Sequence, residues 1–279
     1  MPLISVNGIK LNYEEYGSGP PVVLITGTAT PGRVWKPYQV PALTGAGYRV
    51  ITIDNRGVAP SDIPAGGTSL GELAADAVAL IKSLRLGPCR IVGYSLGAMI
   101  TQELLAGWPG LASQAVLMAT RGRTDALSMA LSQAEQALLD AGVTLPVAYH
   151  AVVRAMQGLS PRTLRDDSRA RDWLDLFEMS APDPASARAH LGTELIPDRR
   201  DGYRRIRTPC LVVGFGDDLI TPPAMCREVA QSIPGSTYQV IPGCGHLGYL
   251  ENPARVNSLI IDFFRGAAER DPGGPPGAG

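Results

Sequence analysis

The fold of this chain is decided by the stretch Cys89-Arg90-Ile91-Val92-Gly93-Tyr94-Ser95-Leu96-Gly97-Ala98. Its centre reads G-x-S-x-G. A short, mostly apolar run typical of a buried strand precedes the serine, and residues 98–106 are rich in good helix formers and lack Pro and Gly. A strand that turns sharply into a helix at a serine is a nucleophile elbow, with glycines where the backbone is crowded. We therefore expect Ser95 to be a nucleophile beside the N–H groups of a helix N-terminus.

Strand-like and helical segments alternate on both sides of this stretch. Strand-like runs, most of them continuously apolar as in strands covered on both faces, are found at residues 21–26, 48–53, 115–119, 210–214 and 237–241. Residues 70–84 have apolar side chains at the helical period. At the N-terminus, Asn7-Gly8 between two strand-like runs predicts a hairpin. This alternation predicts an α/β fold with a mostly parallel, doubly wound sheet of about eight strands.

The alternation is interrupted between residues 121 and 205, where the sequence has no strand-like run. Helices are predicted there at residues 126–139, 146–156, 161–177 and 185–191. We expect an α/β core of residues 1–120 and 206–265, with 121–205 inserted as a helical cap over the carboxyl edge of the sheet. The Gly/Pro/Ala-rich tail, 266–279, is expected to be disordered.

The overall composition excludes several classes of partner. The net charge is -1 and no basic run interleaved with aromatics is present, so neither nucleic acid nor a membrane is expected as a partner. The four cysteines lack C-x-x-C spacing and are expected to be buried free thiols. No motif for a metal or a cofactor appears, and we expect neither. The absence of a signal-like segment and of a long apolar run predicts a cytoplasmic protein. For the oligomeric state, a monomer and a homodimer are both expected alternatives.

A serine hydroxyl needs a neighbouring base, and the base needs an orienting carboxylate. Of three histidines, His150 and His190 fall in predicted helices of the insertion, where surface or hydrogen-bonding roles are expected. His246 follows the last strand, at the sheet edge where the elbow serine emerges, which makes it the candidate base. Asp217 and Asp218 both follow the preceding strand and compete for the role of the acid. The order Ser, Asp, His is that of α/β-hydrolases.

With these motifs the chain resembles the α/β-hydrolase-fold serine hydrolases. That group includes small esterases, cofactor-free haloperoxidase-like perhydrolases, C–C bond hydrolases and tailoring esterases of bacterial natural-product (antibiotic) pathways. The resemblance spans about residues 22–264, apart from the insertion. It is based on residues 93–97, 54–57 with Ser61, 218–222, 245–247 and 251–253.

The resemblance also implies roles for individual residues. It assigns the acid to Asp218, because Ile220 and Pro222 stand at the offsets of the family's D-x-[apolar]-x-P motif. It implies an oxyanion hole formed by the backbone N–H groups of Leu96 and Thr28.

Thr26 stands where the family usually has histidine, which puts the conformation of the oxyanion loop in question. Arg56 is expected to be a structural ion pair or loop clamp. The residues expected to contact substrate are Thr30, Trp35, Tyr94, Tyr149, Trp173 and Phe177.

The combined motifs predict a serine hydrolase that forms an acyl-enzyme on a carboxylic ester, thioester or lactone. The substrate is a small molecule or a carrier-bound acyl group. The alternative is the same triad used for acyl transfer, C–C bond hydrolysis or cyclisation in a secondary-metabolite pathway. A non-catalytic ligand-binding protein is disfavoured, because all three triad positions hold competent residues. Epoxide hydrolases and haloalkane dehalogenases need a carboxylate at the elbow, where this chain has Ser95.

Overall fold

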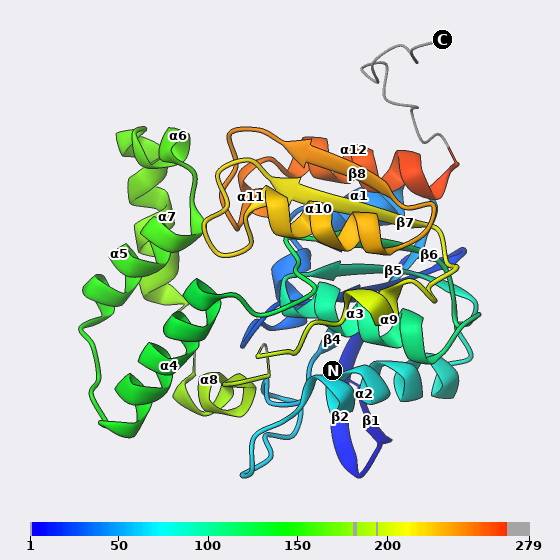
Figure 1. Ribbon diagram of the computed structural model, residues 1–279, viewed down its shortest axis with the longest axis horizontal. Coiled ribbons are helices and arrows are strands. Elements are labelled where there is room, and N and C mark those ends of the chain that lie inside the picture. Colours follow the sequence, from blue (N-terminus) through cyan, green and yellow to red (C-terminus); the bar gives the residue numbers. More distant parts are fainter. Residues whose placement is uncertain (1, 181–182, 194, 267–279) are drawn as a thin grey trace.

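An eight-stranded sheet in the order β1-β2-β4-β3-β5-β6-β7-β8 forms the centre of the molecule (Figure 1). The computed structural model describes residues 2–180, 183–193 and 195–266. Only the pairs β1–β2 and β2–β4 are antiparallel. The strands are β1 Leu3–Val6, β2 Ile9–Tyr16, β3 Pro21–Ile25, β4 Arg49–Asp54, β5 Cys89–Tyr94, β6 Ala112–Met118, β7 Cys210–Phe215 and β8 Thr237–Ile241. The predicted mostly parallel sheet of about eight strands is confirmed. Of the tail predicted to be disordered, residues 267–279 lie outside the described residues.

The predicted hairpin joins β1 to β2. Asn7 and Gly8 have φ values of 46° and 75°, as the two central residues of a type I′ turn require. The hairpin lies at one end of the sheet, and the parallel strands occupy the other (Figure 1).

Helices cover both faces of the sheet. One face packs against α2 (Leu70–Ser83), α3 (Leu96–Gly107) and α10 (Pro223–Ser232), and the other against α1 (Gln39–Gly45) and α12 (Pro253–Phe264). Alternate residues of β5 belong to the two clusters, Ile91 to the first and Val92 to the second, and both are fully buried. This two-sided burial explains why the strands read as continuous apolar runs.

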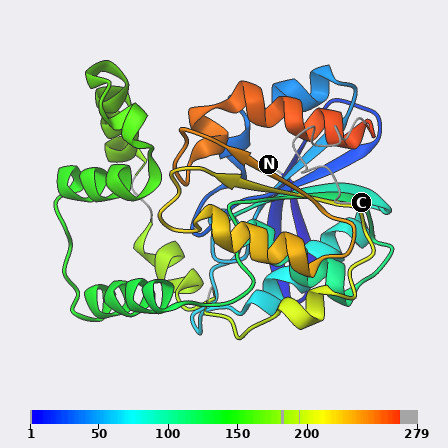
Figure 2. The same cartoon turned by 45° about the horizontal axis from the view of Figure 1, so that its top comes forward.

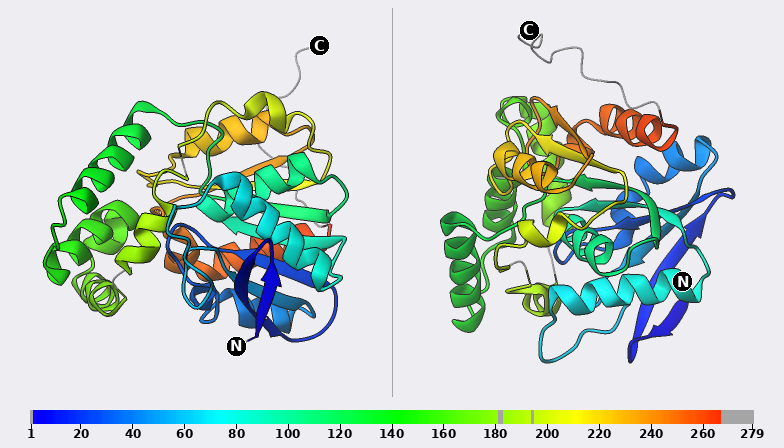
Figure 3. Two further views of the ribbon diagram at one scale, coloured as in Figure 1. Left: turned by 90° about the horizontal axis from the view of Figure 1, so that it is seen from below. Right: turned by 45° about the vertical axis from the view of Figure 1, so that its right-hand side comes forward.

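Between β6 and β7, the described residues form six helices. They are α4 Ala126–Asp140, α5 Val147–Gly158, α6 Pro161–Leu164, α7 Asp167–Met179, α8 Pro184–His190 and α9 Arg200–Tyr203. Helices α4 to α8 stand beyond one edge of the sheet rather than over either face (Figures 2 and 3). Helices α5 and α7 pack together through a small cluster that contains Ala151, Ala155 and Phe177. The division of the chain into a core and a cap stays a prediction.

The single helix predicted at 161–177 is wrong, since α6 and α7 are separate. The Asp166 side chain accepts hydrogen bonds from the N–H groups of Ser168 and Arg169, both at 3.1 Å, and thereby caps α7. The two remaining short helices are η1 Gly32–Trp35 and α11 Gly248–Glu251. Among the described helices, none combines the length and the apolar character needed to cross a membrane.

The elbow between β5 and α3 is a crowded turn. Ser95, the only residue between the two elements, has φ 53° and ψ -121°. A Cβ on Gly93 would lie 2.4 Å from the Gly97 carbonyl oxygen, and a Cβ on Gly97 would lie 2.2 Å from the Ile25 carbonyl oxygen. Because both obstructing atoms belong to the backbone, neither can move aside cheaply, and only glycine fits.

This packing gives a first prediction. Gly97→Ala should lower the free energy of unfolding by about 1–3 kcal/mol, because the added methyl group forces β3 and α3 apart. Gly107→Ala is the matched control on the same helix, because its Cβ would meet nothing within 4 Å. Urea denaturation of both variants measures the difference. Equal stabilities would show that the elbow is not crowded.

Candidate active site

Three loops at the carboxyl ends of parallel strands bring Ser95, His246 and Asp218 together. Ser95 follows β5, Asp218 follows β7 and His246 follows β8. His246 Nε2 lies 3.1 Å from Ser95 Oγ, and His246 Nδ1 lies 2.8 Å from Asp218 Oδ2. Both distances are within hydrogen-bonding range. The arrangement is that of a nucleophile, a base and an orienting carboxylate.

Asp218 is held as a buried carboxylate by several donors. Its Oδ1 accepts the N–H groups of Ile220 and Thr221 at 2.8 and 2.9 Å, and its Oδ2 accepts the Thr221 hydroxyl at 2.7 Å. Burial by itself would raise the pKa of Asp218, but the charge of His246 and the hydrogen bonds from His246 and Thr221 outweigh it, so the pKa lies below its ordinary value. Asp217 is placed differently: its backbone N–H bonds to the Cys244 carbonyl.

The loop that carries His246 is held by Tyr94, by Glu251 and, through Glu251, by Ser160 of the insertion. The Tyr94 hydroxyl donates to the His246 carbonyl oxygen at 3.1 Å, and the two ring centroids are 5.3 Å apart. The Gly245 N–H donates to Glu251 Oε2 at 2.6 Å. Glu251 Oε1 in turn accepts the N–H and hydroxyl of Ser160, at 3.0 and 2.7 Å. These bonds fix the backbone of the loop, and the hydrogen bond between His246 Nδ1 and Asp218 orients the ring toward Ser95.

The Thr26-to-Thr30 loop lies directly against the elbow. A Cβ on Gly27 would lie 3.2 Å from Ser95 Cβ. The Thr26 hydroxyl donates to the Thr30 carbonyl oxygen at 2.7 Å, so Thr26 ties this loop together from inside. Thr28, whose N–H is a predicted oxyanion donor, is exposed in this loop. The other predicted donor, Leu96, is the first residue of α3, where helical N–H groups have no partner within the helix.

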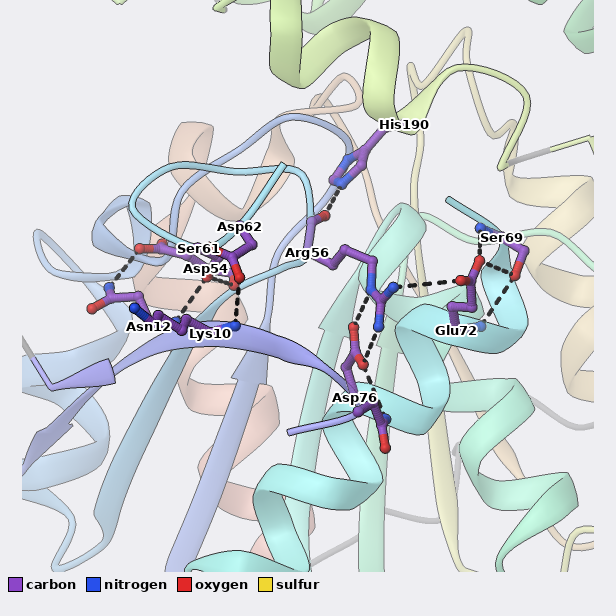
Figure 4. Close-up of polar contacts among 11 residues, drawn as sticks. Lys10, Asn12, Asp54, Arg56, Ser61, Asp62, Ser69, Glu72, Asp76 and His190 are labelled. Atoms are coloured by element: carbon purple, nitrogen blue, oxygen red, sulfur yellow. Dashed lines mark hydrogen bonds and ion pairs between the residues drawn. The ribbon is translucent and has the colours of Figure 1, made fainter. Parts of the chain in front are cut away.

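The sequence did not predict that His190 lies at the candidate site. It ends α8 and is 1% exposed. Its Nδ1 accepts the N–H of Ala29 at 2.9 Å, and its Nε2 lies 2.5 Å from the Arg56 carbonyl oxygen (Figure 4). An N–H can only donate and a carbonyl can only accept, which assigns the proton to Nε2. His190 therefore joins the Thr26-to-Thr30 loop to the loop after β4, across separations in sequence of 161 and 134 residues.

Arg56 is the loop clamp that the sequence predicts. Its Nε and Nη2 donate to the two carboxylate oxygens of Asp76 at 2.7 and 2.8 Å, and Nη1 lies 3.4 Å from Glu72 (Figure 4). In the same region the Ser61 hydroxyl donates to the Asp54 carbonyl oxygen at 2.7 Å. These contacts anchor the loop after β4 to α2, and His190 packs on that anchored loop.

The predicted substrate contacts fall into two groups. Trp35 and Phe177 are 0% and 2% exposed, and Tyr94 is 4% exposed, so these rings pack in the interior beneath the site or within the insertion. Trp35 and Tyr94 stack edge to face with ring centroids 6.5 Å apart. The structure leaves the other three accessible: Tyr149 is 58% exposed on α5, and Thr30 and Trp173 are half-buried.

Metal-ligating side chains do not gather anywhere in the described part of the chain: no group of three His, Cys, Asp or Glu could hold an ion. The four cysteines are buried free thiols, as predicted. Burial raises the pKa of Cys89, Cys210 and Cys226 to about 12, which keeps these thiols protonated and unreactive.

Comparison with known proteins agrees with this fold. A model described as "Alpha/beta hydrolase family" matches residues 22–259. A Mycobacterium tuberculosis protein named "Putative non-heme bromoperoxidase BpoC" is 45% identical over 260 residues, which cover 92% of this chain and 98% of that protein. The crystal structure of BpoC has a TM-score of 0.89 and 43% identity and covers 94% of this chain and 97% of that chain.

More distant relatives carry other names. A Variovorax paradoxus protein named "Putative carbamate hydrolase RutD" is 28% identical over 92% of this chain and 96% of its own length. The structure of a thermophilic esterase from Thermogutta terrifontis has a TM-score of 0.80 and 27% identity, and covers 95% of this chain and 96% of that chain. The relatives therefore share the fold and differ in the activities for which they are named.

The contacts of His190 give a prediction for the Thr26-to-Thr30 loop. His190→Ala leaves the Ala29 N–H and the Arg56 carbonyl without a buried partner, and the loop beside Ser95 should relax. We expect labelling of Ser95 by a fluorophosphonate probe to slow by about tenfold, since each lost buried hydrogen bond costs about 1–3 kcal/mol. Arg188→Ala is the control on the same helix, because it removes only exposed contacts, an ion pair with Asp140 and a hydrogen bond to the Leu139 carbonyl oxygen. Equal labelling rates in the two variants would contradict a role for His190.

Proposed function

The chain belongs to the alpha/beta hydrolase family, and from this premise we propose that it is a serine hydrolase that works through an acyl-enzyme. The substrate class is a carboxylic ester, thioester or lactone, as a small molecule or a carrier-bound acyl group. The proposal rests on the hydrogen bonds that link Ser95 to His246 and His246 to Asp218. They place a nucleophile next to a base, and the base next to a carboxylate. Relatives named as an esterase and a carbamate hydrolase support hydrolysis as the reaction.

The proposed reaction begins at the serine hydroxyl. Ser95 Oγ attacks the carbonyl carbon while His246 Nε2 accepts the hydroxyl proton and later delivers it to the leaving group. The buried Asp218 carboxylate keeps the proton of neutral His246 on Nδ1 and stabilises the imidazolium that forms. Water then attacks the acyl-enzyme by the same route in reverse, which regenerates Ser95 and releases the acid.

We propose that the N–H groups of Leu96 and Thr28 stabilise the negative charge that develops on the carbonyl oxygen. Support for Leu96 comes from its place at the start of α3, and support for Thr28 from its neighbour Gly27, which lies so close to Ser95 that an added Cβ would be 3.2 Å from Ser95 Cβ. We further propose that residues 121–205 act as a cap that selects the substrate, because α5 and α8 contact the loops of the site directly. A cytoplasmic location and a monomeric or homodimeric state stay predictions.

The proposal predicts unequal effects of two neighbouring aspartates. Asp218→Asn should lower kcat for p-nitrophenyl acetate by about 10³- to 10⁴-fold, because an amide cannot hold the imidazole in the required tautomer. Asp217→Asn is the matched control and should change kcat by less than about threefold. Ser95→Ala sets the baseline and should lose fluorophosphonate labelling altogether. A Ser95→Ala variant that hydrolyses the ester at the wild-type rate would overturn the mechanism.

The similarity to BpoC favours a second candidate reaction at the same site. In it, hydrogen peroxide instead of water attacks the acyl-enzyme and releases a peroxycarboxylic acid. The peroxycarboxylic acid then oxidises bromide to hypobromous acid and returns to the carboxylic acid. Wild-type protein with acetate, peroxide and bromide should brominate monochlorodimedone, and Ser95→Ala should not. Bromination that persists in Ser95→Ala would place the oxidation outside this site.

A further inference from the structure

Helix α5 ends directly on the loop that carries His246. The Leu247 N–H donates to the Gly158 carbonyl oxygen at 2.8 Å. Gly158 is so close that an added Cβ would lie 3.0 Å from Leu247 Cδ1. Side chains in the last turns of α5 are thereby held next to the catalytic loop. Arg154 lies one turn before Gly158, and His150 lies one turn before Arg154 on the same face.

Arg154 occupies this position without a carboxylate partner among the described residues. Its guanidinium lies over the Phe177 ring, 4.6 Å from the centroid, and Nη1 donates to the Ser180 carbonyl oxygen at 3.1 Å. In the described part of the chain, Nε and Nη2 have no acceptor within hydrogen-bonding distance. The guanidinium of Arg154 is thus held in place by stacking on Phe177, and its Nε and Nη2 can still donate two hydrogen bonds to a carboxylate.

The surroundings of Arg154 connect it to the reaction centre. Burial lowers the pKa of Arg154, and the side chains of Tyr249 and Tyr94 lie near enough to interact electrostatically with its guanidinium. Tyr94 is the residue that donates to the His246 carbonyl. A guanidinium stays charged at neutral pH even so. It therefore presents a partly desolvated positive charge on the side of the insertion that faces the catalytic residues.

The ring of His150 also has an unused hydrogen-bonding group. Its Nδ1 is buried and has no hydrogen-bond partner. Burial, together with the Arg154 charge, lowers the pKa of His150, so the ring is neutral and one of its nitrogens can carry a proton to donate. A buried polar atom without a partner costs stability unless something else satisfies it.

From these contacts we propose that Arg154, with His150 beside it, binds a carboxylate of the substrate, so that the enzyme selects esters or lactones that also carry a free carboxylate group. The inference rests on the proposed serine hydrolase function and specifies its substrate class. A carboxylate is the complement of both groups, because it offers four lone pairs to the open guanidinium edge and to an imidazole N–H. The competing explanation is that Arg154 only caps the C-terminus of α7 through Ser180.

A matched substrate pair separates these explanations. Monomethyl and dimethyl esters of succinate, glutarate and adipate differ only in whether the distal group is charged, and a pH-stat measures their hydrolysis. Wild-type protein should prefer the monoester of at least one chain length. Arg154→Met keeps packing on Phe177 but removes the charge, and should lower the ratio of kcat/KM for monoester over diester by about 10- to 100-fold. Arg154→Lys should lower that ratio less.

Arg188→Met is the control for net charge, because it removes an exposed positive charge from the insertion and should leave the ratio unchanged. If Arg154→Met lowers both rates equally, or if wild-type protein shows no preference for any monoester, the carboxylate site is overturned. Fluorophosphonate labelling of Ser95 in every variant distinguishes failure of the carboxylate site from failure of the proposed serine hydrolase function. Labelled protein without a preference refutes only the carboxylate site, whereas wild-type protein that is not labelled refutes the proposed function itself.

Discussion

The steric crowding at the strand-to-helix turn around Ser95 is the constraint on which the rest of the site depends. Ser95 has a left-handed φ of 53°, a conformation that typically costs about 1–3 kcal/mol for a residue with a side chain. It persists because both flanking elements are fixed: the Ser95 N–H bonds to Met118 in β6, and its carbonyl accepts from Ala98 and Met99 in α3. The result is a hydroxyl at the carboxyl edge of the sheet, within reach of the loops after β7 and β8.

Each side chain around that hydroxyl is held by a second partner from elsewhere in the chain. Asp218 is fixed by Thr221, and the loop of His246 is fixed by Tyr94 and Glu251. Such support would keep the proposed reacting groups at hydrogen-bonding distance without reorganisation during the proposed reaction. The low pKa of Asp218 has the same origin, because the donors that orient the carboxylate also stabilise its charged form.

The insertion supports the site at two places. At one, the end of α5 binds the loop of His246 through Gly158. At the other, the end of α8 holds the Thr26-to-Thr30 loop through His190. The segment that we propose selects the substrate therefore also fixes two of the loops that position the reacting groups. Changes in the insertion should therefore alter geometry and selectivity together, and we propose that Arg154 contributes to the selectivity.

The sequence by itself determined the sheet, the elbow and the residues that follow the strands, because these depend on neighbours along the chain. Apolar runs specify buried strands, the glycines of the elbow permit its turn, and parallel strands bring their carboxyl ends to one edge. The tertiary structure alone decided how the insertion packs. The break before α7, the burial of Trp35 and the contacts of His190 and Arg154 could not be predicted. They arise between segments far apart in sequence, and such contacts depend on packing that local preferences do not encode.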